Sequence, residues 1–550
     1  MGLSRWLIIP SPLGSFKQSR YHNPMHGQNI SLSIQTFEIL IQENRIYVDK
    51  TEGIHTLLTS GLRACFFSRP RRFGKSLTIS TLDAIFTGKK HLFENLAISK
   101  TDYAWPIHPV IRLDMKYAAE ADLATAENGL SEMLKTLAEK NNILLREGTV
   151  STLFENLIQQ LYQKTGQKAV ILIDEYDKPL IDNLDNMAEA KKIQGLLKRF
   201  YGVLKSADEF IRFVFITGVS KFSKVSVFSD LNHLQDLTMN PTYATLVGMT
   251  ETELTTYYSP YIQAIADQKQ WTLSQILEEI RRWYNGYRFS ESEFKVYNPW
   301  STLSLFYTGK FQEHWYTTGI PKMLVDVINR DPESFSNSNP ADFDELSDYN
   351  IAQIDTYDIE QLQLIPLMLQ TGFLTLKGYD EDLSTYQLGY PNFEVRQAFS
   401  RMVLDTRLTQ TFELNPLVIP QKIRKYLRER NMEAVIAQLN ALLASIPGIL
   451  HIPREAYYHS LIHMIFQASG LTIRSEEWVA GGRIDTVIEE PDCFYIIEFK
   501  FGATAQVAID QIKHRKYSDK FKSGSLPIFA LGIAVDCETK SILEWKLEQL

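Results

Sequence analysis

The chain has 550 residues, of which 44% are hydrophobic and 22% are charged, and its formal net charge is −8 at pH 7. These values are ordinary for a globular protein, and the length predicts several domain-sized units. A net negative charge excludes a surface that binds nucleic acid everywhere, although local basic patches are compatible with it. The three scattered cysteines are too few for a zinc site or a disulfide framework and indicate a reducing compartment.

The N-terminal segment predicts neither a targeting signal nor a folded element. Residues 1–24 are rich in Ser, Pro, Gly and His, and their apolar run WLII is too short for a signal-peptide core or a membrane span. No stretch of 18 apolar residues occurs in the chain. We therefore expect a cytoplasmic protein without membrane contact and a disordered segment 1–30, within which Met25 is an alternative start.

Three regions follow along the chain. In residues 31–250, helical segments alternate with four apolar runs that predict a parallel sheet covered on both faces: ACFFS (64–68), PVIRLDM (109–115), AVILIDE (169–175) and RFVFITGVS (212–220). Residues 251–450 are mostly helical by pattern. Residues 451–550 predict a smaller α/β unit, because a helix precedes the β-type runs RIDTVIEE and CFYIIEFKF, and a helix and a strand follow them.

The stretch FFSRPRRFGKSLT (66–78) has the order of a phosphate-binding loop. Gly74, Lys75 and Ser76 follow an apolar strand and open a helix, where backbone N–H groups and a lysine meet phosphate and a Ser hydroxyl ligates Mg²⁺. Arg69 stands where the usual motif has its first glycine, a position that often needs a conformation costly for a side chain. Alone, the stretch leaves a phosphate loop and a basic turn equally open.

A second motif supports the first. AVILIDEYDKP is an apolar strand that ends in Asp174 and Glu175, like the motif of P-loop ATPases in which the aspartate contacts Mg²⁺ and the glutamate directs the attacking water. An acidic helix cap is the alternative. Thr217 and Ser220, at the end of the next strand, are equally compatible with γ-phosphate sensors and with a strand-to-loop cap. The runs predict a P-loop NTPase-type sheet with one strand inserted between the two motifs.

Four segments together resemble the bacterial AAA-ATPase-like family, whose members often end in a PD-(D/E)XK nuclease-like domain: YVDKT (47–51), SRPRRFGKS (68–76), IDEYDKPL (173–180) and ITGVSKFS (216–223). WYNGYRF, VYNPWS and HWYTTGIP extend the similarity, which covers about residues 31–550. The resemblance implies that RPRRFGKS, with Arg69, is the family's own loop. It implies Mg·ATP bound by Arg71, Arg72, Gly74, Lys75, Ser76, Leu77, Asp174 and Ser220, with Ser76 and Asp174 on the metal and Glu175 as the catalytic residue.

The C-terminal unit contains a carboxylate pair, in the order D-x₁₂-E-x-K. Glu498 and Lys500 are two apart on a strand and share a face, and a turn at EPDC brings Asp485 beside Glu498. Two such carboxylates suit Mg²⁺, which activates water while Lys500 orients it or stabilises the transition state. This pattern resembles the PD-(D/E)XK nuclease core and predicts a small restriction-endonuclease-like α/β domain. In that family a glutamine at the place of Gln511 helps to position water or substrate.

Two neighbouring features are less specific. Glu455 and His459 lie four apart on the preceding helix. Glu455 is compatible with an accessory metal ligand and with a solvated helix edge, and we interpret His459 as part of that edge. The basic stretch IKHRKYSDKFK (512–522) equally fits contact with a phosphate backbone and a solvated helix face.

The sequence thus predicts an ATPase coupled to a Mg²⁺-dependent nuclease that acts on DNA rather than RNA, in a chain compatible with homo-oligomers. The helical middle region would act as lid and coupling element. The alternative is a signalling or regulatory ATPase switch whose nuclease-like domain only binds a partner or nucleic acid.

Overall fold

A computed structural model describes the chain with gaps. It covers residues 29–118, 122–221, 227–228, 231, 233–315, 324–325, 327, 343–355, 363–408, 418–444, 455–479, 482–522, 526–536 and 538–550. Side chains are not described at 355, 403–408, 418, 455–457, 460 and 475–479. The predictions for residues 1–28, including Met25, and for the side chain of Glu455 therefore lie outside the described part. Among the described residues, no helix is both long and apolar enough to cross a bilayer.

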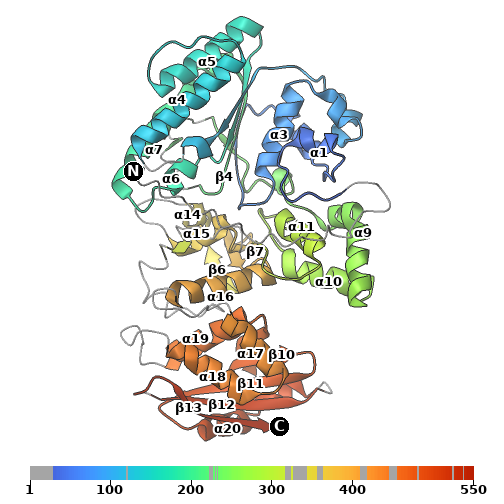
Figure 1. The fold of residues 1–550 in the computed structure, drawn as a ribbon, viewed down its shortest axis with the longest axis vertical. Helices are drawn as coiled ribbons and strands as arrows, with labels where there is room; N and C mark the ends of the chain where they lie inside the picture. The colour runs from blue at the N-terminus through green and yellow to red at the C-terminus, as the bar shows by residue number, and fades with distance from the viewer. Residues whose placement is uncertain are drawn as a thin grey trace, which may run out of the picture.

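The N-terminal unit is built on a five-stranded parallel sheet with the order β2-β3-β4-β1-β5. In Figure 1, where β4 is labelled, this sheet lies between α4, α5 and α7 on one side and α1 and α3 on the other. The strands are β1 (Ala64–Ser68), β2 (Val110–Asp114), β3 (Ala169–Asp174), β4 (Ile211–Gly218) and the short β5 (Gln235–Asp236). The four apolar runs are β1 to β4, so the predicted parallel sheet is confirmed. Strand β4 lies between β1, which carries the phosphate-loop motif, and β3, which carries the acidic motif.

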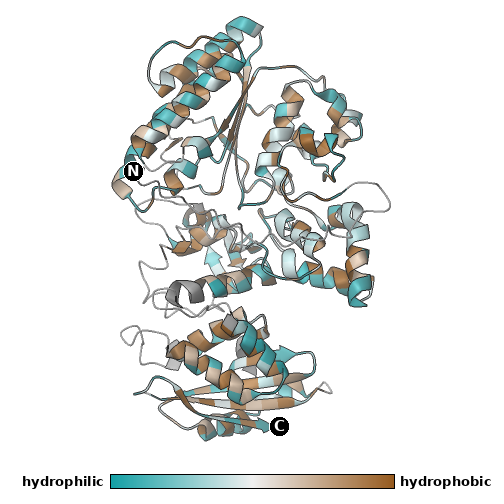
Figure 2. Cartoon of the chain, in the orientation of Figure 1, coloured by the Kyte–Doolittle hydropathy of each residue, from teal (hydrophilic) through white to brown (hydrophobic). Residues whose placement is uncertain are grey.

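Helices cover both faces of this sheet because its strands are apolar on both sides (Figure 2). One face packs on α4 (Leu123–Lys140), α5 (Val150–Thr165) and α7 (Met187–Ser206). The other face packs on α1 (Phe37–Gln42), α2 (Thr51–Thr59) and α3 (Lys75–Phe86). Phe66 belongs to the first core and its neighbours Cys65 and Phe67 to the second, as the two-residue period of a strand requires.

The middle region is mostly helical, as the pattern predicts. Its helices are α9 (Glu251–Lys269), α10 (Leu273–Tyr284), α11 (Pro299–Thr308), α14 (Ile351–Asp355), α15 (Leu364–Thr371) and α16 (Phe393–Leu408). Capping boxes of Thr250 with Glu253 and of Thr272 with Gln275 start α9 and α10. A three-stranded antiparallel sheet, β6 (Leu346–Tyr349), β7 (Thr375–Asp380) and β8 (Thr385–Gly389), adds to the predicted helices.

The C-terminal unit holds a five-stranded mixed sheet with the order β13-β12-β11-β10-β9. The strands are β9 (Thr472–Val479), β10 (Gly482–Glu490), β11 (Cys493–Phe501), β12 (Ile528–Val535) and β13 (Ile542–Gln549). Helix α20 (Ala505–His514) connects the parallel strands β11 and β12, and α19 (Glu455–Ala468) precedes the sheet. Helices α17 (Val418–Arg428) and α18 (Met432–Leu443) also lie with this unit, where Asn440 exchanges two hydrogen bonds with the backbone of Ile542.

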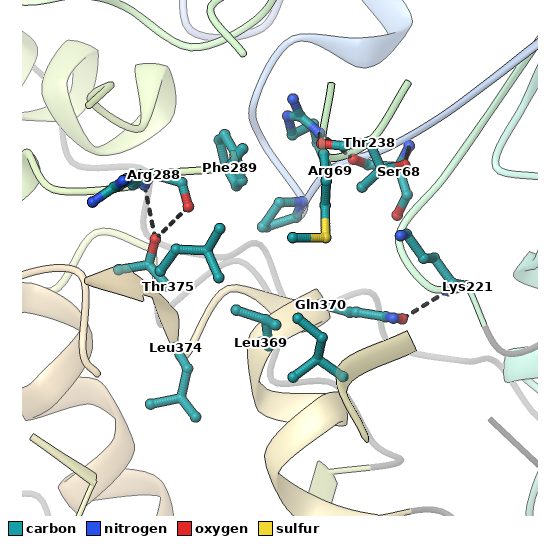
Figure 3. A pocket seen from close by; sticks show the side chains of 14 residues that line it. Ser68, Arg69, Lys221, Thr238, Arg288, Phe289, Leu369, Gln370, Leu374 and Thr375 are labelled. Carbon is teal, nitrogen blue, oxygen red and sulfur yellow. Dashed lines mark hydrogen bonds between the residues drawn. The ribbon is translucent and has the colours of Figure 1, made fainter. Parts of the chain in front are cut away.

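The WYNGYRF segment, residues 283–289, connects the N-terminal unit to the rest of the chain. The ring centroid of Phe73, in the phosphate loop, lies 4.7 Å from that of Tyr287 and 5.3 Å from that of Phe289. Next to these rings, a cavity of about 60 Å³ separates the end of β1 from α15 and β7 (Figure 3). Figure 3 also shows the bond from the Lys221 amide to Gln370, which crosses this junction, and the bonds between Arg288 and Thr375 within the middle region.

Candidate functional site

The phosphate-loop motif forms a turn between β1 and α3 with two residues in the left-handed region. These are Arg72, with φ 70°, and Gly74, with φ 101°. A Cβ built at Gly74 would have no atom within 4 Å, so the glycine is needed for the backbone conformation and leaves open space above the helix N-terminus. Arg69 does not have a positive φ, and the loop therefore accommodates an arginine where the usual motif has glycine.

Arg69 is buried beneath the loop and does not line the large cavity above it. Its guanidinium donates to the carbonyls of Ser68, Thr238 and Tyr243. It also lies 4.3 Å from the ring centres of Phe67 and Phe289. Burial lowers the pKa of Arg69 to about 9. This side chain fixes the base of the loop to the segment after β5 and to the middle region.

The loop and α3 border a cavity of about 410 Å³. From the loop and the first turn of the helix the lining includes Arg71, Arg72, Gly74, Lys75, Ser76 and Leu77, and from the opposite side Pro299, Trp300 and Leu303 of α11. Lys75 is only 7% exposed, and its Nζ donates to the carbonyls of Arg69 (2.8 Å) and Pro70 (2.9 Å). Burial lowers the pKa of Lys75 to about 8, against the opposing effect of nearby carboxylates. Backbone N–H groups and cations thus meet at one end of the cavity.

Asp174 and Glu175 take different positions at the end of β3. Asp174 is buried, and its Oδ1 accepts hydrogen bonds from the Thr217 hydroxyl (2.7 Å) and the Glu175 amide (3.1 Å). Glu175 has φ 52°, lines the cavity, and pairs through Oε1 with Lys116 Nζ at 3.2 Å. Burial lowers the pKa of Lys116, but the charges of Glu175 and Asp114 outweigh it and the net shift is upward.

Ser220 is fully buried behind this strand end. Its hydroxyl donates to Asp177 Oδ2 at 2.6 Å, and the same oxygen accepts the amides of Val219 and Ser220. Burial raises the pKa of Asp177. Ser220 is not among the residues that line the cavity, whereas Thr217 contacts Asp174 directly. Of the two predicted phosphate sensors, Thr217 is therefore nearer to the acidic motif, and Ser220 anchors the end of β4.

Several lining residues were missed by the motif search. Lys116, after β2, and Lys178, at the start of the short helix α6 (Lys178–Ile181), bring two further cations to the cavity. Trp300 lies 4.3 Å from the Arg72 guanidinium, measured to the ring centre. Lys178 lies within IDEYDKPL and Trp300 within VYNPWS, two segments that the sequence already singled out, whereas nothing in the sequence around Lys116 pointed to this cavity.

The C-terminal carboxylates gather on β10, β11 and α20. Strands β10 and β11 form an antiparallel hairpin. Its pairing begins with Glu490 opposite Cys493 and reaches Thr486 opposite Ile497, so that Asp485 and Glu498 form the next pair. Asp485 Oδ2 accepts the Phe499 amide at 2.9 Å. Glu498 is 1% exposed, and its Oε1 accepts from Lys500 Nζ at 3.2 Å and from the Gln511 amide. The structure thus brings together all four residues that the sequence assigned to this site.

The neighbouring features differ from their expectations. His459 is 8% exposed, not part of a solvated helix edge, because α19 turns this face toward the sheet. The helix in the basic stretch ends at His514, and Lys516 has φ 53°. Tyr517 is buried there, and its hydroxyl donates to the carbonyl of Arg483 at 2.7 Å.

The two sites fit the groups that their chemistry implies. The open space at Gly74, the helix N-terminus and the buried Lys75 suit a nucleotide phosphate. Within the described parts of the chain, no three His, Cys, Asp or Glu residues gather as a metal cage. The pair Asp485 and Glu498 nevertheless supplies the hard oxygen donors of Mg²⁺, which is usually held by one or two carboxylates together with substrate phosphate and water.

Comparisons with known proteins match one family to the segment with the phosphate loop and another to the segment with the carboxylate pair. Residues 31–228 match the family described as "Predicted AAA-ATPase", and residues 453–545 match the PD-(D/E)XK nuclease superfamily. A relative from Azotobacter chroococcum mcd 1, named "Uncharacterized protein in vnfD 5'region", is 32% identical over 540 residues. That alignment covers 96% of this chain and 100% of the relative, so the similarity includes the middle region as well as both matched domains.

Proposed function

Because the chain belongs to the AAA-ATPase-like family and ends in a PD-(D/E)XK nuclease superfamily domain, we propose that it is an ATPase whose nucleotide state regulates a Mg²⁺-dependent DNA nuclease. The observation that carries the proposal is the gathering of Asp485, Glu498, Lys500 and Gln511 at one point of the C-terminal sheet. The cavity above the phosphate loop supports the ATPase half. The relative aligns with 96% of this chain, so both domains occur together in a second protein, which supports a functional connection between them.

In the nucleotide site, Lys75, whose Nζ donates to two loop carbonyls at the inner end of the cavity, would meet the phosphates of ATP. Arg71 and Arg72 add positive charge at the same end. Ser76 and Asp174 would hold Mg²⁺, which would neutralise phosphate charge. Glu175, which pairs with Lys116, would direct the attacking water.

In the nuclease site, Asp485 and Glu498 would hold Mg²⁺, which would activate water and offset charge on the phosphodiester. Lys500 lies beside Glu498 and would orient the attacking water. Gln511 donates to Glu498 and fixes the direction of its carboxylate. DNA is the proposed polymer, and RNA is the comparison in the test below.

The middle region connects the two sites. Helix α11 supplies one wall of the nucleotide cavity through Trp300, and the WYNGYRF segment packs Tyr287 and Phe289 against the loop residue Phe73. A change in the loop on nucleotide binding would therefore reach the middle region directly. This supports a role as lid and coupling element, which remains part of the proposal.

The test is cleavage of plasmid DNA, linear DNA and RNA by the purified full-length protein with Mg²⁺, with and without ATP. We expect Asp485→Ala to abolish cleavage without changing the unfolding midpoint. Asp510→Ala is the matched control, since Asp510 is an exposed acid of α20 that bonds only Gln506 among the contacts described for its side chain. Equal cleavage by Asp485→Ala and the wild type would overturn the nuclease assignment.

The ATPase half needs its own pair of variants. Lys75→Ala is expected to abolish ATP binding measured by calorimetry, whereas Lys90→Ala, at an exposed position after α3, should bind ATP like the wild type. ATP binding without cleavage of any polymer, and without Mn²⁺ binding at the carboxylate pair, would instead favour a regulatory ATPase switch. Unchanged ATP binding in Lys75→Ala would overturn the proposed nucleotide site.

A further inference from the structure

Asp485 is the β10 residue next to Thr486, which pairs with Ile497 of β11 and with Ser475 of β9. Its carboxylate is a predicted metal ligand and needs a fixed direction, so the contacts that hold its backbone bear directly on the site.

His459 contacts the backbone of Asp485 from α19. Its Nε2 lies 3.0 Å from the carbonyl oxygen of Asp485 and 3.3 Å from the hydroxyl of Thr486. A carbonyl oxygen only accepts, so Nε2 carries the hydrogen and donates it to Asp485. The side chain therefore holds the backbone of the residue whose carboxylate belongs to the site.

The same imidazole supports Asp485 by a second path. The centroid of its ring lies 5.3 Å from that of Phe499, and the amide of Phe499 donates to Asp485 Oδ2 at 2.9 Å. His459 thus contacts both the backbone of Asp485 and the residue that holds its carboxylate. These contacts form a closed ring of His459, Asp485 and Phe499 beside Glu498.

Helix α19 is itself fixed at its far end. Gln467, two turns beyond His459, is 3% exposed and lies 2.6 Å from the hydroxyl of Ser400 on α16. The residue that supports Asp485 therefore stands on a helix that is anchored to the middle region. The position of His459 is set by the interface between the units as well as by the sheet.

We propose that His459 is a positioning residue of the carboxylate pair: by donating to the backbone carbonyl of Asp485, it sets the direction of that carboxylate toward Glu498 and thereby the affinity of the pair for a divalent cation. The inference rests on the proposed metal site. It adds a residue outside the D-x₁₂-E-x-K pattern that acts through Asp485 and does not touch the substrate.

The test measures Mn²⁺ binding to the full-length protein by calorimetry, without DNA or ATP. His459→Phe keeps a ring against Phe499 but removes the donor, and we expect it to weaken Mn²⁺ binding about tenfold, the loss of one hydrogen bond to a buried group. His459→Gln keeps an N–H of similar reach and should restore affinity to within about threefold of the wild type. In cleavage assays, His459→Phe should raise the Mn²⁺ concentration for half-maximal rate more than it lowers the rate at saturating Mn²⁺.

Three controls separate this inference from its premise. His91→Gln, at an exposed histidine of the N-terminal unit, should leave Mn²⁺ affinity unchanged. If His459→Phe lowers the unfolding midpoint, His459→Asn replaces it, because this shorter amide fits the space but does not reach the carbonyl. Wild-type affinity in His459→Phe or His459→Asn, with affinity lost in Asp485→Ala, would overturn the role of His459 alone. Equal Mn²⁺ affinity in the wild type and Asp485→Ala would overturn the metal site and the inference together.

Discussion

The two candidate sites are built in different ways. The nucleotide cavity lies between units: the loop and α3 form one wall, and α11 of the middle region forms another. The carboxylate site instead comes from one hairpin and the helix after it, and Glu498 is bonded to Lys500 and Gln511 within the same unit. The first site is an open cavity of about 410 Å³, whereas the key carboxylate of the second is 1% exposed.

Because of this difference, the nucleotide site depends on contacts between units, whereas the carboxylate site depends mainly on local hydrogen bonds. A cavity between units changes whenever the units move, so its affinity should respond to the contacts that join them. A site within one sheet keeps its geometry as long as the local hydrogen bonds hold. We therefore expect changes at the joint between the units to affect nucleotide binding more than metal binding at Asp485 and Glu498.

The largest expected effect comes from Gly286, in the WYNGYRF segment. Its φ is 115°, and a Cβ there would lie 2.0 Å from the carbonyl oxygen of Pro391, just before α16. Gly286→Ala should cost about 2–4 kcal/mol, from a strained backbone and a clash with main-chain atoms that cannot move freely. Urea unfolding followed by tryptophan fluorescence measures the loss. ATP affinity should fall, because Tyr287 shifts against Phe73, while Mn²⁺ affinity should fall less, because the joint reaches the carboxylate site indirectly, through α16 and α19.

Gly202 provides the matched control. It lies within α7, its φ is not positive, and a Cβ there would meet no atom within 4 Å. Gly202→Ala should gain about 0.5–1 kcal/mol, because alanine loses less conformational freedom in a helix. An unfolding midpoint of Gly286→Ala at or above that of the wild type would contradict the role of this joint.

The parts of the fold that could be predicted are those whose burial produces a simple hydrophobic pattern in the sequence. Strands β1 to β4 are buried on both faces, so each reads as an apolar run. Strands β9 and β13 were missed because they are the edges of the C-terminal sheet and read TIRSEEWV and ILEWKLEQ, with charges throughout. Edge strands carry such charges because one side meets solvent, and they therefore lack the apolar signal.

The site residues divide in the same way. Asp485, Glu498 and Lys500 could be predicted because strand periodicity and one tight turn fix their neighbourhood within the hairpin. Trp300 could not, because its approach to the loop depends on how distant units pack. His459 was assigned to solvent because its helix, EAYYHSLIHMIFQA, is apolar around most of its circumference and does not reveal which side the sheet covers.

Trp300 gives the second test of the comparison. It lines the nucleotide cavity and lies over the guanidinium of Arg72, so Trp300→Ala removes a wall and frees a loop cation. We expect ATP binding to weaken by about 1–2 kcal/mol, or roughly tenfold, the value of a partly desolvated cation–π contact. Trp271→Ala, at a tryptophan in the turn before α10 that does not line the cavity, is the control. An equal loss of Mn²⁺ affinity in Trp300→Ala would show that the two sites are not independent.

A further effect at the same joint depends on pH. Glu394, near the start of α16, is fully buried, accepts the amide of Trp315 at 2.7 Å, and has its pKa raised by burial from 4.5 to about 8. Between these values the folded chain keeps a proton that the unfolded chain has lost, so this group's contribution to stability is fully present below pH 4.5 and declines as pH rises toward 8. Glu394→Gln keeps the acceptor and removes the titration. Its unfolding free energy should therefore match that of the wild type near pH 4.5 and exceed it increasingly toward pH 8, by up to about 1.4 kcal/mol per pH unit. Thermal unfolding at several pH values measures the difference. A difference that stays constant with pH would show that Glu394 is ionised in the folded protein. Another group would then compensate the cost of burying its charge.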